Sequence, residues 1–165
     1  MIRDSGLVAA SWRDLNVFHW RGKSSLAQLK ACNELNLRAA TAQADKKIAI
    51  LTVVSAPEIT FPDAEMRREL EEGQSRLAES KKAETVVIQT QGFVAAAVRG
   101  IVAGSMLLKR TPTPTRLAGS VHEACTWIAP MLAHAGGRPI PGEEVHAAVD
   151  SILKTDVTSG NARTA

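Results

Sequence analysis

Apolar and polar residues alternate in two short stretches near the beginning of the chain. Residues 6–12 and 16–21 each predict a β-strand, because side chains two positions apart lie on the same face of a strand. The short connection between them predicts a β-hairpin. In the second strand, His19 and Arg21 share a face with Val17. We interpret this face as the solvent side of an edge strand; the alternative is that the two side chains line a pocket.

Beyond the hairpin, helical spacing of apolar residues alternates with short apolar runs. Leu29, Cys32 and Leu35 recur at a spacing of three, so one face of their helix is buried. The predicted elements, in order, are a helix from Ser24 or Ser25 to about 44, a strand over 47–54, a helix over 63–82, a strand over 85–90, a helix over 92–109, a strand over 116–121, a helix over 122–135 and a helix over 143–154.

This order of elements predicts the fold class. It is α/β, with an N-terminal β-hairpin followed by alternating helices and strands. Right-handed crossovers then give a mostly parallel sheet flanked by helices. The 165 residues fit one domain over 1–156, with 157–165 as a flexible tail. Hydrophobic residues make up 45% and charged residues 22%, which is typical of a globular protein.

The helix over 63–82 is strongly charged. Its acids precede Lys81 and Lys82, an order that complements the helix dipole. Most of this helix is expected to face water, because its apolar stripe is narrow and consists of Met66, Leu70 and Leu77.

Charge and cysteine usage bound the class of protein. The formal net charge is +3, and basic residues are interspersed with acids, so we expect no nucleic-acid partner. Cys32 and Cys125 are far apart and have no CxxC neighbour, which argues against a disulfide framework or a zinc site. The first residues lack the apolar run of a signal peptide. We therefore expect a reduced, cytoplasmic protein.

The most apolar segment of the chain is the predicted helix over 92–108. It is too short to span a membrane comfortably and carries Arg99 near its centre, so we expect no membrane insertion. It is nevertheless apolar nearly all round, which predicts that more than one of its sides is covered. Small residues also recur every four positions along it, at Gly92, Ala96, Gly100 and Gly104.

Two interpretations of this helix remain open. It is either packed between the sheet and the C-terminal helix, or it forms the interface of a homo-oligomer. Large uncovered apolar patches are rare on monomers. We adopt the second interpretation, with an interface formed by Phe93, Ala96, Arg99, Gly100, Ile101 and Gly104.

One stretch resembles the STAS, or SpoIIAA-like, family of anti-sigma-factor antagonists: KIAILTVVSAPEITFPDAEMRREL, residues 47–70. In that family a strand and a short loop lead to a motif of the type F-x-D-S-S-G-L that opens a helix, and here Phe61 and Asp63 match it. Ala64 and Glu65 occupy the two serine positions, so the family's phosphorylation switch has no acceptor here. The resemblance implies the fold and a partner-binding role, and no chemistry.

The carboxyl ends of the predicted parallel strands form a candidate ligand or anion site, because ligands of open α/β sheets bind at that edge. The candidate residues are Ser55, Gln91, Gly92 and His122. Gln91 and Gly92 precede a helix, whose first backbone N–H groups favour anions. The sequence has no phosphate-loop or dinucleotide fingerprint.

His122 and Cys125 are three positions apart and could form a nucleophilic pair, but a third orienting group is missing, and packing explains Cys125 equally well. We expect no catalytic residue, metal or cofactor. The predicted function is a non-enzymatic regulatory or scaffolding protein that self-associates through 92–108 and can bind another regulatory protein. The alternative is a small-molecule or lipid carrier whose cavity is walled by that helix.

Overall fold

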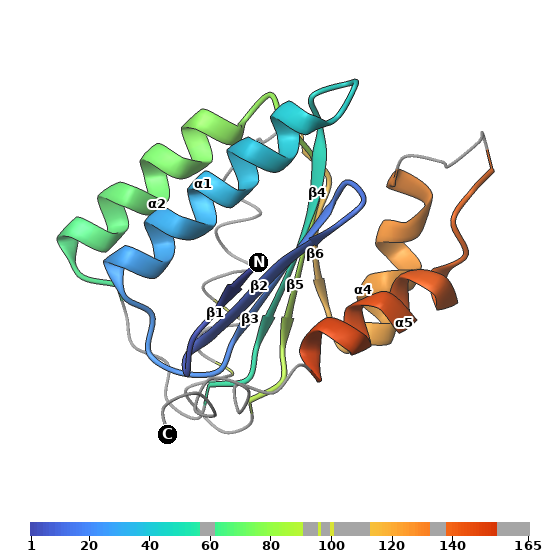
Figure 1. The fold of residues 1–165 in the computed structure, drawn as a ribbon. Helices are drawn as coiled ribbons and strands as arrows, with labels where there is room; N and C mark the ends of the chain where they lie inside the picture. Colours follow the sequence, from blue (N-terminus) through green and yellow to red (C-terminus); the bar gives the residue numbers. More distant parts are fainter. Residues whose placement is uncertain (57–61, 91–95, 97–99, 101–112, 133–137, 155–165) are drawn as a thin grey trace, which may run out of the picture.

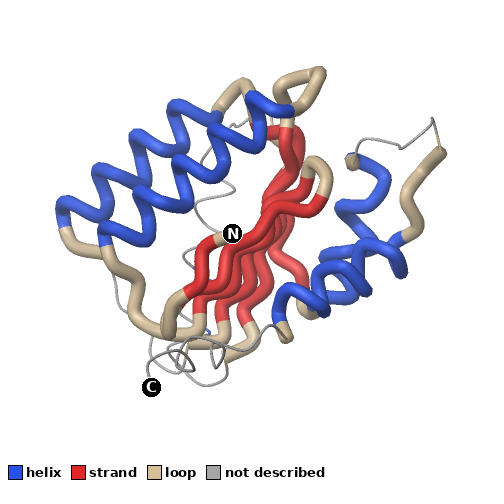
Figure 2. The backbone as a smooth tube through the Cα atoms, viewed as in Figure 1, coloured by secondary structure: helices blue, strands red, loops and turns tan. Residues whose placement is uncertain are grey.

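The protein is a layered α/β structure. The computed structural model describes residues 1–56, 62–90, 96, 100, 113–132 and 138–154. In this part of the chain a sheet of six strands separates two layers of helices (Figures 1 and 2). Helices α1 and α2 cover one face, and α4 and α5 cover the other (Figure 1).

The strands follow one another across the sheet in sequence order. Pairing is antiparallel from β1 to β3 and parallel from β3 to β6. This confirms the predicted fold class, a hairpin followed by a mostly parallel sheet. The strands are β1 (Ile2–Arg3), β2 (Leu7–Trp12), β3 (Leu15–Trp20), β4 (Ile48–Val54), β5 (Lys81–Ile88) and β6 (Thr115–Ala118).

The helices begin at polar caps or at a proline. Ser25, not Ser24, caps the first helix, where its side chain and that of Gln28 form a reciprocal capping box. None of the described helices is long and apolar enough to cross a bilayer. The helices are α1 (Leu26–Ala42), α2 (Ala64–Leu77), α4 (Val121–Ile128), the 3₁₀ turn η1 (Ala129–Met131) and α5 (Gly142–Leu153).

The predicted C-terminal end of α2 was wrong. The helix ends at Leu77, and Lys81 and Lys82 begin β5 instead of closing the helix. Lys81 is buried and forms an ion pair with Glu84, and Lys82 pairs with the buried carboxylate of Asp14. Local helix-dipole reasoning missed the strand because β5 is fixed by its pairing with β4, and the partner of Lys82 is 68 positions away in the chain.

The interpretation of β3 as an edge strand was also wrong. It lies between β2 and β4, and His19 is only 9% exposed. The true N-terminal edge is β1, whose two residues, Ile2–Arg3, are too few to leave a periodic pattern.

The helix predicted over 122–135 is shorter and begins earlier. Ser120 caps α4 by accepting a hydrogen bond from the backbone of Glu123, so Val121 is already helical. Pro130 then lies in η1, because a proline cannot donate the backbone hydrogen bond that would continue an α-helix. The domain boundary at 156 and the tail 157–165 lie outside the described residues.

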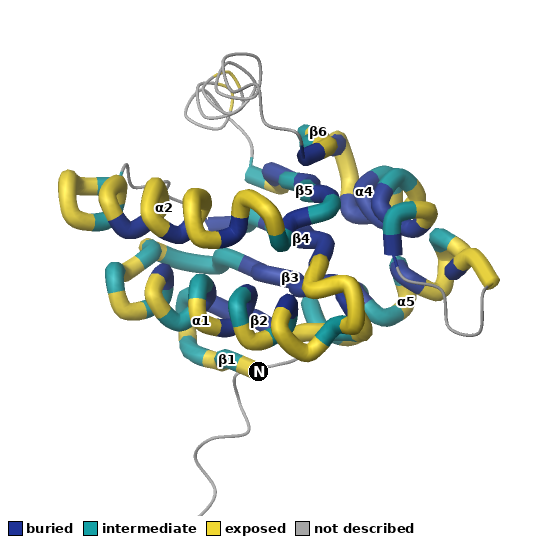
Figure 3. Tube along the Cα trace, turned by 90° about the horizontal axis from the view of Figure 1, so that it is seen from above, coloured by how far each residue is buried: buried dark blue, intermediate teal, exposed yellow. Residues whose placement is uncertain are grey.

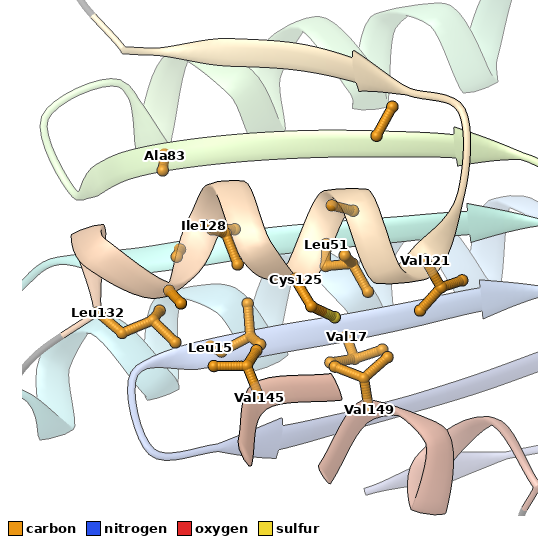
Figure 4. Close-up of a cluster of buried hydrophobic side chains, with 14 of the residues drawn as sticks. Leu15, Val17, Leu51, Ala83, Val121, Cys125, Ile128, Leu132, Val145 and Val149 are labelled. Atoms are coloured by element: carbon orange, nitrogen blue, oxygen red, sulfur yellow. The ribbon is translucent and has the colours of Figure 1, made fainter. Parts of the chain in front are cut away.

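Apolar side chains form a separate core on each face of the sheet. Beneath α4 and α5, Cys125 packs with residues such as Leu51, Ile128 and Val149 (Figure 4). Beneath α1, Cys32 packs in a second core with Leu7, Ala9, Phe18, Leu35, Ala40, Ile48 and Ile50. Burial raises the pKa of both thiols to about 12, and nearby Asp4 adds to the shift at Cys32.

Helices α1 and α2 are held together by a polar contact at a close approach. Asn33 Nδ2 donates to Glu69 Oε1 at 2.7 Å, and Arg76 Nη2 donates to the same oxygen at 3.0 Å. Glu69 is buried, and opposite it Gly73 faces the amide of Asn33. A Cβ at Gly73 would lie closer than 3.0 Å to that amide, so any larger residue requires the Asn33 side chain to move.

We expect Cys32 and Cys125 to react slowly and at similar rates with iodoacetamide in the native protein. With a pKa of about 12, roughly one thiol in 10⁴ is ionised at pH 8. Time-resolved mass spectrometry of peptides measures both rates. Rapid, selective labelling of Cys125 would contradict its burial.

We also expect Gly73→Ala and Asn33→Ala to be coupled. In the Asn33→Ala background, the new alanine should raise the free energy of unfolding by about 1 kcal/mol through helix propensity. In the wild-type background the alanine at position 73 must displace the Asn33 amide from Glu69, and the rise in the free energy of unfolding should be cancelled or reversed. Urea unfolding of the wild type, the two single variants and the double variant measures the coupling. Additive changes in the free energy of unfolding would refute the close contact.

Candidate functional site

A cavity of about 400 Å³ lies between α1, α2 and the sheet. Its floor comes from β3, β4 and β5, and its walls come from the inward faces of the two helices, whose outward faces are mostly exposed (Figure 3). Most of the lining is apolar: Phe18, Trp20, Gly22, Leu29, Cys32, Ile50, Val54, Ala56, Pro62, Met66, Leu70 and Leu77. The polar lining residues are Ser24, Asn33, Asn36, Thr52, Gln74 and Glu84.

The register of the strands orders the floor of the cavity. Asn16, Ile50 and Glu84 form one row across β3, β4 and β5. Two rows further toward the carboxyl ends, Trp20 and Val54 are paired. Of the first row, Ile50 and the charged Glu84 line the cavity, whereas Asn16 is fully buried beneath it, and the floor is apolar at Trp20 and Val54.

The helical walls follow the same gradient. Both helices connect parallel strands, so they run back from the carboxyl ends of the strands toward the amino ends. Leu29 and Met66, early in their helices, thus lie toward the carboxyl ends of the strands, and Asn36 and Gln74 lie toward the amino ends. Polar groups are therefore more frequent toward the amino ends of the strands, although Ser24 lines the opposite end and Leu77 lines this one.

A chain of hydrogen bonds orients Asn36 at the polar end. Ser11 Oγ donates to Asn16 Oδ1 at 2.6 Å, and Asn16 Nδ2 donates to Asn36 Oδ1 at 2.7 Å. Asn16 is fully buried and Asn36 is 5% exposed. These bonds satisfy the amide of Asn16 inside the sheet and fix the side-chain amide of Asn36 at the cavity wall.

An ion pair borders the same end. Lys81 Nζ donates to Glu84 Oε2 at 2.5 Å and to Gln74 Oε1 at 2.6 Å. The side chains of Lys81 and Glu84 are 6% and 18% exposed. Because the two charges compensate, this end of the cavity has polar character with little net charge.

A second polar cluster lies at the carboxyl edge of the sheet, on the face covered by α4 and α5. His19 Nε2 is 2.7 Å from Ser55 Oγ, and Arg21 Nε donates to His19 Nδ1 at 3.1 Å. Arg21 also donates to the carbonyl oxygen of Leu153 at the end of α5. Arg21 thereby ties the last helix to β3.

The order of donors in this cluster argues against an activated serine. Because Nδ1 of His19 accepts from Arg21, Nε2 carries the proton and donates to Ser55. Burial, and secondarily the positive charge of Arg21, lowers the pKa of His19 to about 4. At neutral pH the imidazole is uncharged, and the nitrogen facing Ser55 cannot take its proton.

The structure describes two of the four residues of the predicted ligand or anion site. Ser55 bonds to His19, whereas His122 is exposed on α4 with its ring against His146, at a centroid distance of 5.3 Å. Gln91 and Gly92 lie outside the described residues. Cys125 points into the core and is fully buried (Figure 4), whereas His122 is exposed. In the described ranges, no cluster of His, Cys, Asp or Glu is arranged to hold a metal ion.

The predicted interface is described at two positions. Ala96 and Gly100 are both helical and exposed. Phe93, Arg99, Ile101 and Gly104 lie outside the described residues, as does most of the wall of the predicted carrier cavity.

Sequence reasoning missed the cavity between α1 and α2. One signal was available: Asn33 and Asn36 interrupt the otherwise apolar inward side of α1, and Asn16 interrupts the inward side of β3. Amides at such positions need partners, and the partners came from elements far apart in the sequence.

Comparison with family models finds no match for this chain, and comparison with curated proteins finds none either. Among solved structures, the chain is similar to an uncharacterized protein of the DUF3478 family from Shewanella loihica PV-4, which is described as having a SpoIIAA-like fold. The TM-score is 0.50 at 13% identity, over 73% of this chain and 90% of that one. At this identity the likeness concerns the fold alone. Together with the strand order and the two helical layers, it shows that this chain has a SpoIIAA-like α/β fold.

Proposed function

We propose that this chain is a non-enzymatic protein that binds a small, largely apolar molecule in the cavity between α1 and α2. The observation that supports this is the cavity itself: about 400 Å³ and mostly apolar, with Asn36, Gln74 and Glu84 toward one end. Cavities of roughly 300–1,000 Å³ with this kind of lining are typical of small-molecule sites. The proposal keeps the carrier function considered for the sequence and moves its site to α1 and α2.

Two further observations are consistent with binding without chemistry. His19 is uncharged and donates its Nε2 proton to Ser55, so it cannot act as a general base toward that serine. Both cysteines are buried with raised pKa values. Because these thiols lie in separate cores, we also propose a reducing, cytoplasmic location.

Leu70→Asp should weaken binding of the neutral apolar dye N-phenyl-1-naphthylamine about tenfold. Leu70 is 38% exposed and lines the cavity, so the substitution removes apolar contact and adds a charge at little cost to folding. Fluorescence titration measures the affinity. Ser75→Asp is the matched control, because Ser75 is an exposed residue of the same helix outside the lining; its affinity should stay within about twofold of wild type. Failure of the wild-type protein to bind the dye would refute the proposal.

A second proposal is self-association through the surface formed by Ala96 and Gly100, both of which are helical. The two residues are four positions apart, which places them on one side of a helix, and both are exposed. A Cβ built at Gly100 meets no atom within 4 Å, so a larger side chain fits there within one chain. Such a surface would suit close contact with a second copy.

Gly100→Leu should weaken an oligomer more than it lowers the stability of the monomer, because a Cβ at Gly100 has no described atom within 4 Å and a leucine obstructs close approach of a partner. Size-exclusion chromatography with light scattering over a dilution series measures the assembly. Ala147→Leu, an exposed position on α5, is the control and should leave it unchanged. A wild-type protein that stays monomeric at high concentration would refute self-association.

A further inference from the structure

The side-chain amide of Asn36 offers a hydrogen-bond donor to the cavity. Asn36 is 5% exposed and lines the cavity, and its Oδ1 accepts a hydrogen bond from Asn16 Nδ2. Its Nδ2 donates to no atom of the described residues and is not among their buried unpaired atoms, so it faces the cavity. A ligand in the cavity that presents an acceptor to Asn36 Nδ2 can therefore use this donor.

Glu84 supplies the complementary group. Its Oε2 is taken by Lys81, and its Oε1 accepts no hydrogen bond from the described residues. The side chain is 18% exposed and lines the same cavity. Lys81, the counter-charge, is itself held by Glu84 and Gln74 and has little freedom to turn toward a ligand.

The free donor and the free acceptor lie on opposite sides of the central strand of the cavity floor. Asn36 is bonded to Asn16 on β3, and Ile50 on β4 separates Asn16 from Glu84 on β5. Two strand spacings put the main chains of β3 and β5 about 10 Å apart, and Asn36 projects from α1 above the β3 side of that floor. A head group whose acceptor and donor are different atoms spans it better than a single hydroxyl.

We propose that the cavity selects a neutral ligand with an apolar body and a head group that both accepts and donates hydrogen bonds, as a primary amide does. The head accepts from Asn36 Nδ2 and donates to Glu84 Oε1. The body extends along the apolar end of the cavity, past Trp20, Val54 and Met66. This inference rests on the proposed function, because it names the ligand class of the same site.

A carboxylate is the chemistry that this arrangement disfavours. A carboxylate head can accept from Asn36, but it would place a second negative charge near Glu84 Oε1 and has no proton to donate. Lys81 cannot offset the repulsion between the ligand carboxylate and Glu84, because its charge is already paired with Glu84. An ester, with an acceptor only, would leave Glu84 Oε1 unmatched and should bind with intermediate affinity.

Three probes with the same hydrocarbon body test the inference: octanamide, methyl octanoate and octanoate. Each is titrated against the wild-type protein carrying bound N-phenyl-1-naphthylamine, and the loss of fluorescence gives its affinity. Octanamide should bind at least tenfold more tightly than methyl octanoate, with octanoate weakest.

Glu84→Gln tests the role of the carboxylate. It leaves the positive charge of Lys81 uncompensated, so the preference for octanamide over octanoate should fall at least tenfold. Glu71→Gln removes one negative charge from an exposed position of α2 outside the lining and should leave the preference unchanged. If Glu84→Gln does not fold, the wild-type series alone still decides the inference.

The outcomes separate this inference from the proposed function. Dye binding with equal affinities for the three probes, or with octanoate the tightest, overturns the ligand class and leaves the small-molecule site in place. An unchanged preference in folded Glu84→Gln overturns the role of Glu84. Absence of dye binding overturns the proposed function and the ligand class together.

Discussion

The parallel pairing of β3 with β4 is the constraint on which the rest of the structure depends. It runs in register from Leu15 opposite Ala49 to Trp20 opposite Val54 and joins the N-terminal hairpin to the alternating part of the chain. Parallel neighbours require a crossover, which α1 provides. Because the pairing places β3 inside the sheet, both of its faces are buried, and its alternating residues serve two different cores.

Burial of both faces makes polar residues on β3 costly, and the protein satisfies them in two ways. Asn16 is neutral and bonds to neighbours on β2 and α1, so its partner Asn36 is held at the wall of the cavity. His19, on the opposite face, stays uncharged because burial lowers its pKa to about 4, and it bonds to Ser55 and Arg21. One polar residue thus shapes the cavity, and the other links the last helix to the sheet.

The walls of the cavity are not independent of each other. The Asn33–Glu69 bond and the close approach at Gly73 set the spacing of α1 and α2, and Asn33 itself lines the cavity. The volume available to a ligand therefore depends on a helix–helix contact as well as on the lining side chains. A change in that contact would alter the cavity volume by changing the spacing of α1 and α2.

The sequence by itself determined the order and type of most elements, because hydrophobic periodicity is a local property. The hairpin, the apolar β4 and the capped α1 all follow from residues close in the chain. The tertiary structure decided what depends on distant partners. Lys81 and Lys82 belong to a strand because β5 pairs with β4, and Lys82 also bonds to the distant Asp14. His19 is buried because β4 lies beside its strand. The cavity also depends on distant partners. Asn16, Asn36 and Glu84 form no local pattern in the sequence, and only the sheet register and the paths of α1 and α2 bring them close together.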